Sequence, residues 1–308
     1  MNCLNYMLMR GINMCSDLVS VVVPTYKRKP EMLKRCVDSV LSQTYKNIEL
    51  IVVDDSPSDY PFREDVKSFL NSYDNRIHYI QHHKNMGANI ARNTGVDNSN
   101  GKYIAFLDDD DEWAPTKLEK QYKLIYNNPN VSLVYCRAQI IDENSGETKP
   151  IINWMYRGSQ YHRLLKQNFI GSNSFVLVDK EKFYMVGKYD ESLLSNQDYD
   201  LFIRLSKDYE IDFIDEVLVN YYIHEGERIS TNAEKQLQGR LALYDKHLPE
   251  LKKDKDLYTI WNIKNIPLYY RVGEKKKATK SFLKLFAKRP IFLMNYLRGT
   301  LDYIKLSK

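Results

Sequence analysis

The sequence lacks the long apolar segments of integral membrane proteins. No stretch of its 308 residues approaches the ~20 apolar residues that a membrane-spanning helix needs. Residues 1–17 have neither a continuous apolar core nor a clear small-residue cleavage site, so they make a poor export signal. These absences predict a cytoplasmic protein with an N-terminal extension at residues 1–17.

Cysteine is also scarce. The four cysteines are spread through the first half of the chain and form no CxxC pair, and one of them, Cys36, falls on the apolar face of a predicted helix. This pattern disfavours a disulfide framework or a zinc site and favours a reducing compartment.

Charge is unevenly distributed along the chain. Residues 234–308 hold 18 Lys and Arg against 7 Asp and Glu, whereas the rest holds 27 basic against 33 acidic residues. The balance changes sign near Ser230–Ala233. We therefore expect a main domain at residues 18–232 and a basic, helical C-terminal region at residues 233–308.

Apolar runs and amphipathic segments alternate through the main domain. The runs LVSVVVPTY (18–26) and IELIVVDDS (48–56) read as buried strands, and an amphipathic helix between them spans 31–43. This unit predicts a parallel, doubly wound α/β sheet. Further helices are expected at 63–72, 88–98, 115–127 and 198–207, a short one beyond Tyr161 and one from about Lys180, with strands at 76–80, 102–107, 131–141, 172–179 and 210–224.

Three of the predicted strands end in suggestive residues: Pro24-Thr25-Tyr26, Asp54-Asp55 and the run Asp108–Asp111. Each has a simpler structural explanation. The first can be a turn, the second a helix cap, and the third a solvated acidic loop or a weak calcium site. In open parallel sheets, however, ligands bind beyond the carboxyl ends of the strands. Clustered carboxylates also persist where a divalent cation offsets their charge. The three strand ends together favour a ligand and metal site.

Five segments in this order resemble the inverting family 2 glycosyltransferases of the GT-A fold: VSVVVPTYKR, IELIVVDDS, NMGANIARNTG, GKYIAFLDDDD and QDYDLFIRL. The resemblance covers residues 19–230. It implies a doubly wound, mostly parallel sheet with a nucleotide-binding half at 18–112, an acceptor-binding half at 113–232 and a helical C-terminal extension.

The resemblance implies a UDP-sugar donor. Residues of the first strand end match the family's first nucleotide-binding loop, and Asp55 matches the carboxylate that accepts a hydrogen bond from uracil N3–H. Arg92 matches a position near the base or the diphosphate, with an internal salt bridge to the aspartates as its structural alternative. The residues of the first loop are Pro24, Thr25, Tyr26 and Arg28.

The acidic run matches the family's DxD motif and implies Mn²⁺ or Mg²⁺. Asp110 corresponds to the metal ligand, and Asp108 and Asp109 correspond to groups near the ribose. Four consecutive aspartates leave the register open by one position. His224 matches a late histidine that completes the metal site or contacts a phosphate, with a structural role as its alternative.

Asp198 matches the family's general base, which takes the proton from the acceptor hydroxyl. A single displacement of this kind inverts the anomeric configuration. Family members usually carry Glu-Asp here, whereas this chain has Gln197-Asp198. An N-cap role for Asp198 on the following helix is compatible with catalysis.

The acceptor is expected to be a glycan or a lipid-linked saccharide. Trp154, Tyr156 and Tyr161 can stack on sugar faces or pack in the core. The basic C-terminal region is either a peripheral membrane contact at the inner face of the cell membrane or a helical subdomain with a solvated basic face. We expect no nucleic-acid partner, and homo-oligomers stay open.

Two other functions compete with transfer. A sugar nucleotidyltransferase is expected to carry a glycine-rich loop after its first strand, and Pro24-Thr25-Tyr26-Lys27 contains no glycine. A non-catalytic descendant that binds a nucleotide-sugar or a glycan is kept open by Gln197.

Overall fold

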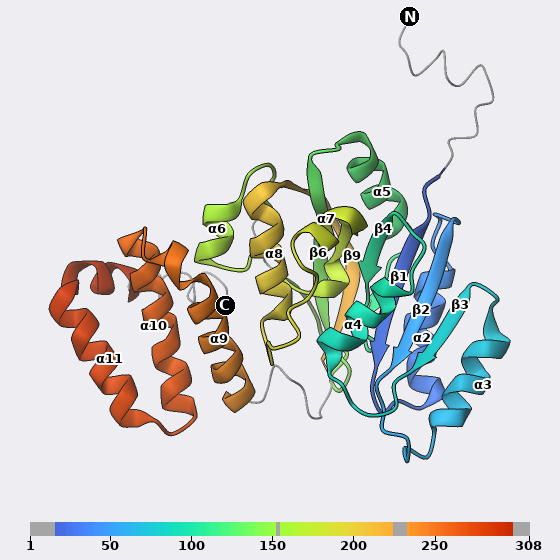
Figure 1. The fold of residues 1–308 in the computed structure, drawn as a ribbon, viewed down its shortest axis with the longest axis horizontal. Helices are drawn as coiled ribbons and strands as arrows, with labels where there is room; N and C mark the ends of the chain where they lie inside the picture. The colour runs from blue at the N-terminus through green and yellow to red at the C-terminus, as the bar shows by residue number, and fades with distance from the viewer. Residues whose placement is uncertain (1–15, 152–154, 224–232, 298–308) are drawn as a thin grey trace, which may run out of the picture. The chain divides into compact units, whose positions relative to one another are not determined.

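The computed structural model describes residues 16–151, 155–223 and 233–297 (Figure 1). The chain forms two compact units. The segments of chain that interrupt the first unit belong to the second. The first comprises the described residues of 1–160, 169–189 and 205–224, and the second those of 161–168, 190–204 and 225–308. The predicted domain boundary between residues 232 and 233 stays a prediction. Residues 161–168 and 190–204 belong to the same unit as the C-terminal helices, so the two units are not divided at a single point in the chain.

The first unit is built on a nine-stranded sheet with the order β3-β2-β1-β4-β8-β6-β9-β5, and β7 pairs with β6. Neighbours from β3 to β4 are parallel, as are β6 and β9, whereas β8, β5 and β7 pair antiparallel. The strands are β1 (Val19–Thr25), β2 (Ile48–Asp54), β3 (Ile77–Gln81), β4 (Tyr103–Phe106), β5 (Glu112–Trp113), β6 (Val131–Asp142), β7 (Thr148–Pro150), β8 (Val176–Asp179) and β9 (Glu210–Ile223).

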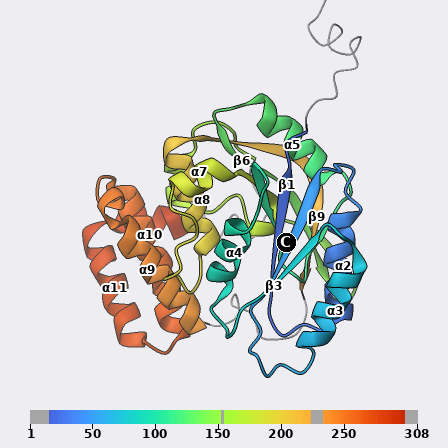
Figure 2. The ribbon, with the colours of Figure 1, turned by 45° about the vertical axis from the view of Figure 1, so that its right-hand side comes forward.

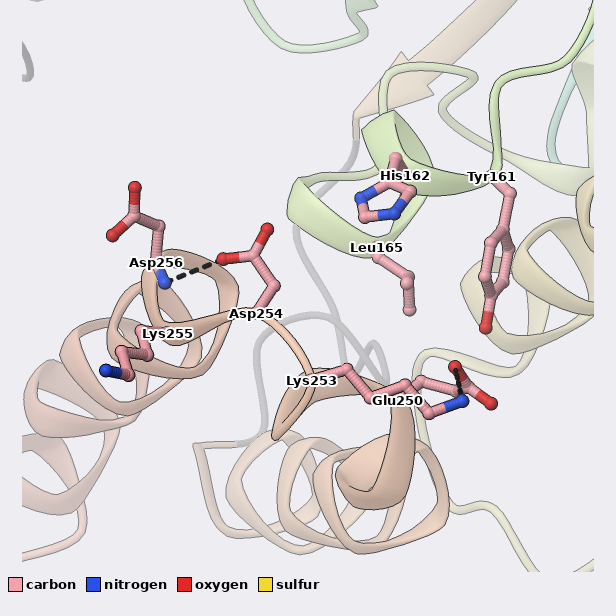
Figure 3. A pocket seen from close by; sticks show the side chains of 8 residues that line it. All are labelled: Tyr161, His162, Leu165, Glu250, Lys253, Asp254, Lys255 and Asp256. Carbon is pink, nitrogen blue, oxygen red and sulfur yellow. Dashed lines mark hydrogen bonds and ion pairs between the residues drawn. The ribbon is translucent and has the colours of Figure 1, made fainter.

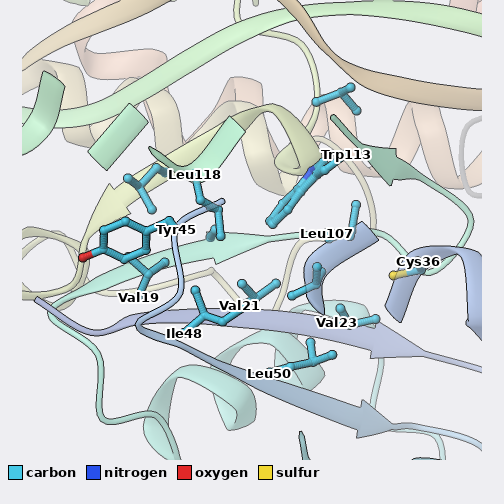
Figure 4. Close-up of a cluster of buried hydrophobic side chains, with 14 of the residues drawn as sticks. Val19, Val21, Val23, Cys36, Tyr45, Ile48, Leu50, Leu107, Trp113 and Leu118 are labelled. Atoms are coloured by element: carbon cyan, nitrogen blue, oxygen red, sulfur yellow. The ribbon is translucent and has the colours of Figure 1, made fainter. Parts of the chain in front are cut away.

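Helices cover both faces of this sheet, because strands buried on both sides carry apolar residues at successive positions. Helices α2 (Pro30–Leu41), α3 (Arg63–Tyr73) and α5 (Lys117–Asn127) share one core with alternate residues of β1 and β2, including Val21 and Leu50 (Figure 4). The intervening residues Ile51 and Val53 of β2 pack against Ala91 of α4 (Ala88–Asp97).

Glycine lets α4 lie close to β1. A Cβ atom on Gly95 would lie 2.3 Å from Cγ1 of Val22, which is too close for any side chain. Gly87, directly before α4, has a φ of 97°, a conformation that favours glycine. Gly95 therefore lets α4 pack closely on β1, and Gly87 permits the turn from which the helix begins.

Two predicted elements differ clearly from the observed ones, and strands β5 and β7 were not predicted. The first half of the expected strand 172–179 is a 3₁₀ turn (Asn173–Phe175), because the Ser172 side chain accepts a hydrogen bond from the Ser174 backbone N–H. The helix expected from Pro115 begins at Lys117, so Pro115 precedes its first turn.

The second unit is helical. It comprises α6 (Tyr161–Lys166), most of α8 (Gln197–Asp208), α9 (Ala233–Leu251), α10 (Lys255–Arg271) and α11 (Lys275–Lys288). Helices α9, α10 and α11 lie side by side (Figures 1 and 2). Buried Trp261 stacks on Tyr199 and donates a hydrogen bond to the Leu165 carbonyl. In the described part of the chain, no helix is long and apolar enough to cross a membrane.

Candidate active site

The acidic run follows β4 at the carboxyl edge of the sheet. Strand β1 lies between β2 and β4, so the predicted first loop after β1 neighbours both Asp55 and the run. The run turns tightly, with the Asp111 backbone N–H donating to the Asp108 carbonyl at 3.0 Å. Its four carboxylates have different surroundings, and the partners come from distant parts of the chain.

Asp109 is held by the loop after β1. Thr25 donates its hydroxyl to Asp109 at 2.7 Å, and the Arg28 guanidinium contacts both carboxylate oxygens at 3.1 and 3.0 Å. The same guanidinium lies 3.6 Å from Asp110. Burial alone would lower the pKa of Arg28, but the charges of Asp109 and Asp110 and the hydrogen bond to Asp109 raise it. Three predicted nucleotide-site residues, Thr25, Arg28 and Asp109, are thus brought together.

Asp108 is paired with Arg92 of α4. The distance between the guanidinium Nη2 and the carboxylate is 2.6 Å, and Arg92 is only 4% exposed. This ion pair is the structural role that the sequence left open for Arg92. Its contact with a nucleotide stays a prediction.

Asp111 is fully buried and accepts a hydrogen bond from the Ser174 hydroxyl at 2.6 Å. Burial, together with the charges of Asp108 and Asp110, raises the pKa of Asp111 well above its ordinary value. A carboxyl group with these neighbours favours its neutral form, which is a poor ligand for a cation. Asp111 is therefore the least suitable metal ligand of the four.

Asp110 offers a partly exposed carboxylate, with 25% of its side chain accessible, and its backbone carbonyl accepts a hydrogen bond from Arg35 at 2.8 Å. Hard divalent cations prefer such oxygen ligands. Among the described residues, no group of three or more His, Cys, Asp or Glu side chains is arranged to hold a metal by itself. His224, the second predicted ligand, lies outside the described residues.

Asp55 is held in a different way, by two backbone N–H groups and a histidine. The backbone N–H groups of Met86 and Gly87 donate to its two oxygens at 2.8 and 2.7 Å. His82 Nδ1 lies 2.7 Å from Asp55, and His82 Nε2 lies 3.0 Å from the Thr94 hydroxyl. The carboxylate is 4% exposed. It is a fixed acceptor at the end of β2.

The remaining predicted loop residues lie beside these groups. Pro24 is the penultimate residue of β1, and Tyr26 follows the strand with 43% of its surface exposed, so its ring is accessible for stacking. Asp54, which the sequence assigns to a cap or loop, accepts hydrogen bonds from the Ser56 backbone N–H and the Tyr79 hydroxyl at 2.9 and 2.6 Å.

Asp198 belongs to the second unit. Helix α8 begins at Gln197, so Asp198 lies inside the first turn and not at the N-cap, the alternative role that the sequence left open for it. Its carboxylate is partly buried and accepts a hydrogen bond from the Tyr199 backbone N–H at 2.7 Å. Gln197 is partly buried as well.

Two residues after Asp198, the fully buried Asp200 contacts two cationic side chains and a histidine. The distances are 2.7 Å to Arg204, 3.0 Å to Lys246 and 3.0 Å to His247. Burial alone would raise the pKa of Asp200, but the His247 hydrogen bond and the positive charges lower it to about 2. These contacts join α8 to α9 within the second unit.

The predicted acceptor-side aromatics have separate surroundings. Trp154 lies outside the described residues. The Tyr156 backbone is hydrogen-bonded to Tyr135, and its ring packs on Phe169, which is a structural role. Tyr161 lines a pocket of about 560 Å³ in the second unit, together with His162, Leu165, Glu250 and residues 253–256 (Figure 3).

Sequence reasoning did not assign three residues to this site that shape it, namely Ser174, His82 and Arg35. Ser174 bridges Asp111 and the Asp108 backbone N–H, and His82 supports Asp55. Arg35 lies with its guanidinium 3.5 Å from the centre of the Tyr222 ring and donates to the run's backbone. Only His82, in the loop HHKNMG, had a local signal, since its imidazole follows a predicted strand. The others depend on long-range contacts.

Comparisons with known proteins show which family the chain is similar to. The family model described as glycosyl transferase family 2 matches residues 20–187. An uncharacterized glycosyltransferase of Methanocaldococcus jannaschii is 34% identical over 252 residues, which cover 82% of this chain and 80% of that protein. A protein of Escherichia coli with the name colanic acid biosynthesis glycosyl transferase WcaA is 31% identical over 271 residues, covering 83% and 91%.

The fold also matches a solved structure. The crystal structure of Staphylococcus aureus TarS 1-349 in complex with UDP-GlcNAc aligns with a TM-score of 0.60 and 15% identity, covering 91% of this chain and 92% of that one. At this identity the likeness concerns the fold alone. The expected GT-A-like architecture with a helical C-terminal region is confirmed.

Proposed function

Because this chain belongs to glycosyltransferase family 2, we propose that it moves a sugar from a UDP-sugar to a hydroxyl of a glycan or lipid-linked saccharide. The observation that carries the proposal is the placement of Asp55, Thr25, Arg28 and the acidic run at one edge of the sheet. The name of the Escherichia coli relative favours an acceptor from polysaccharide synthesis, and the UDP-GlcNAc named for the solved neighbour favours a UDP-sugar donor.

Asp55 would recognise the base. Its Oδ1 is engaged by the Met86 N–H and by His82, whereas its Oδ2 accepts only from the Gly87 N–H and has a further lone pair for a donor such as uracil N3–H. Tyr26, exposed beside it in the chain, would lie against the base. This arrangement discriminates against cytosine, which has no N3–H donor.

Asp110 would hold Mn²⁺ or Mg²⁺, with His224 as a second ligand. The residues fit such an ion, because the run concentrates carboxylate oxygens while Asp108 and Asp109 are already paired with Arg92 and Arg28. When bound, the ion would neutralise negative charge that develops on the departing diphosphate. Arg28, 3.6 Å from Asp110, supplies a further positive charge beside this position.

Asp198 would remove the proton from the acceptor hydroxyl as that oxygen attacks the anomeric carbon. The C–O bond to the UDP leaving group breaks as the new glycosidic bond forms, and the configuration inverts. The Tyr199 N–H, which donates to Asp198, orients the carboxylate within the first turn of α8. General bases of this kind contribute roughly 10²- to 10⁴-fold to the rate.

Release of UDP in the presence of an acceptor tests this proposal. Wild type should release UDP, and Asp198→Asn should lose at least about a hundredfold in kcat while its affinity for the donor, measured by calorimetry, is unchanged. Asp208→Asn, at the exposed end of the same helix, is the matched control and should retain full activity. Donor binding without UDP release in wild type would instead indicate a binding protein.

A further inference from the structure

Large apolar side chains are concentrated on the surface of one part of the second unit. Among the described residues, 17 large hydrophobic side chains are exposed, and seven of them lie in the short stretch 270–297. Ile291 is 76% exposed and Leu283 59% exposed. An apolar surface of this density in one segment indicates a binding face.

The exposed apolar residues of α11 lie on one side of the helix. Ala278 and Leu285 are buried in the clusters that include Tyr269 and Ile263 of α10, which fixes the packed face. Phe282, Leu283 and Phe286 lie beside that face, because residues three or four positions apart share one side of a helix with 3.6 residues per turn. The rings of Phe282 and Phe286 stack with centroids 6.2 Å apart.

The helix that follows continues this face. Leu293 is buried in the same cluster as Leu285, so residues 290–297 pack beside α11. Their exposed residues Ile291, Met294 and Leu297 recur every three positions and so lie along one side of the helix. The two helices therefore present apolar side chains from adjacent elements.

Lysines border the apolar residues of α11. Residues 275–297 contain six lysines and one arginine and no Asp or Glu. Lys276, Lys280 and Lys284 recur every four residues, in a row next to Leu283. Within the described part of the chain these three make no ion pair with a carboxylate, so their charges are not offset locally.

We infer that α11 and residues 290–297 form a docking surface for an anionic lipid bilayer. Phe282, Leu283 and Phe286 would enter the interface between headgroups and acyl chains, and the lysine row would contact the acidic headgroups. Charge complementarity favours this occupant over a second copy of the chain, since a second copy would bring a further row of unpaired lysines. The inference rests on the second unit alone and not on the proposed sugar transfer.

Flotation of the full-length protein with vesicles tests this inference. The protein should bind vesicles of phosphatidylcholine mixed with phosphatidylglycerol, and binding should fall when salt is raised or when phosphatidylglycerol is omitted. Replacing Phe282, Leu283 and Phe286 by Ser, or Lys276, Lys280 and Lys284 by Gln, should lower the affinity at least about tenfold. Circular dichroism would verify that both variants fold.

Matched controls use exposed residues of the first unit. Replacing Tyr126, Met185 and Val217 by Ser, or Lys67, Lys123 and Lys149 by Gln, should leave vesicle binding unchanged. Asp198→Asn should also bind like wild type, which separates lipid binding from catalysis.

Three results would overturn the inference. The first is equal binding of wild type and both α11 variants. The second is a dimer that the apolar variant converts to a monomer, with no vesicle binding, which would assign the face to a second copy. The third is vesicle binding that appears only after deletion of residues 298–308, which would assign the face in the full chain to its own last residues.

Discussion

Two short acidic stretches, one in each unit, each contain a fully buried aspartate. The surroundings of these two aspartates shift their pKa values in opposite directions. Asp111 in the run after β4 and Asp200 in α8 are both 0% exposed. The pKa of Asp111 is raised by burial and by the charges of Asp108 and Asp110, whereas His247, Arg204 and Lys246 lower that of Asp200 to about 2. Burial therefore does not decide ionisation, but the charges of the neighbours do.

The position of the cationic side chains also distinguishes the aspartates within each stretch. In α8 the cations converge on the buried residue, so Asp200 is a structural anion next to the partly exposed Asp198. In the run, Arg28 and Arg92 pair with Asp109 and Asp108 and leave Asp111 with a hydroxyl donor. Each stretch thus combines a buried structural carboxyl group with a more exposed one, Asp110 or Asp198, for which we propose a chemical role.

The largest expected effect separates Asp110 from Asp111. Asp110→Asn should lower kcat/KM for UDP release at least about a hundredfold at a fixed Mn²⁺ concentration, because it removes the anionic ligand. Asp111→Asn replaces a group that favours its neutral form, and it should keep activity within about tenfold of wild type. Steady-state kinetics of both variants decides the register of the DxD motif. A larger loss in Asp111→Asn would move the metal ligand by one position.

The next effect concerns the buried anion of α8. Asp200→Asn removes the carboxylate that pairs with Arg204 and Lys246 and should lower the free energy of unfolding by about 3 kcal/mol, since breaking a buried ion pair leaves uncompensated charge. Urea unfolding at neutral pH measures it, with Asp208→Asn as the exposed control on the same helix. Equal stability of the two variants would contradict the structural role of Asp200.

A pH dependence follows from the same residue. The pKa of Asp200 is lowered from 3.8 to about 2. A carboxyl group with a depressed folded-state pKa contributes stability above its unfolded pKa and loses it as the pH falls through the folded value. Wild type should therefore lose about 2 kcal/mol between roughly pH 4 and pH 2 through this group. Asp200→Asn should show a flatter acid limb in unfolding experiments, and parallel limbs would argue against the shift.

The smallest expected effect concerns the hydrogen bond from Thr25 to Asp109. Thr25→Val keeps the shape of the side chain but removes the hydroxyl that donates to the carboxylate at 2.7 Å. Loss of one such bond costs about 1 kcal/mol, which corresponds to roughly fivefold weaker donor binding. Calorimetry with UDP measures this change. Unchanged affinity would show that Arg28 alone positions Asp109.

Much of the fold could be predicted because strands buried on both faces leave a strong local signal. The runs that became β1, β2 and β4 are mostly apolar, and the helices between them have regular apolar spacing. Strand β5, two residues long and directly after the run, has no such signal. It exists because Glu112 and Trp113 pair with β9, a contact between residues far apart in the chain.

The sequence indicated where the candidate residues lie, but of their charge pairings it offered only that of Arg92 with the aspartates. Strand ends locate Asp55 and the acidic run, because parallel strands place their carboxyl ends at one edge. The partners of the run, Arg28 and Ser174, lie more than 60 residues away and meet it only in the folded chain. For this reason the sequence could not tell which aspartate is buried and which is partly exposed.

The most direct test of the central claim is a thermal-shift measurement of the full-length protein with nucleotide-sugars, with and without Mn²⁺. We expect a UDP-sugar together with Mn²⁺ to raise Tm above the value with Mn²⁺ alone. GDP- and CMP-sugars should give a smaller increase in Tm. The increase should be lost in Asp110→Asn. No stabilisation by any UDP-sugar over metal alone would contradict the account.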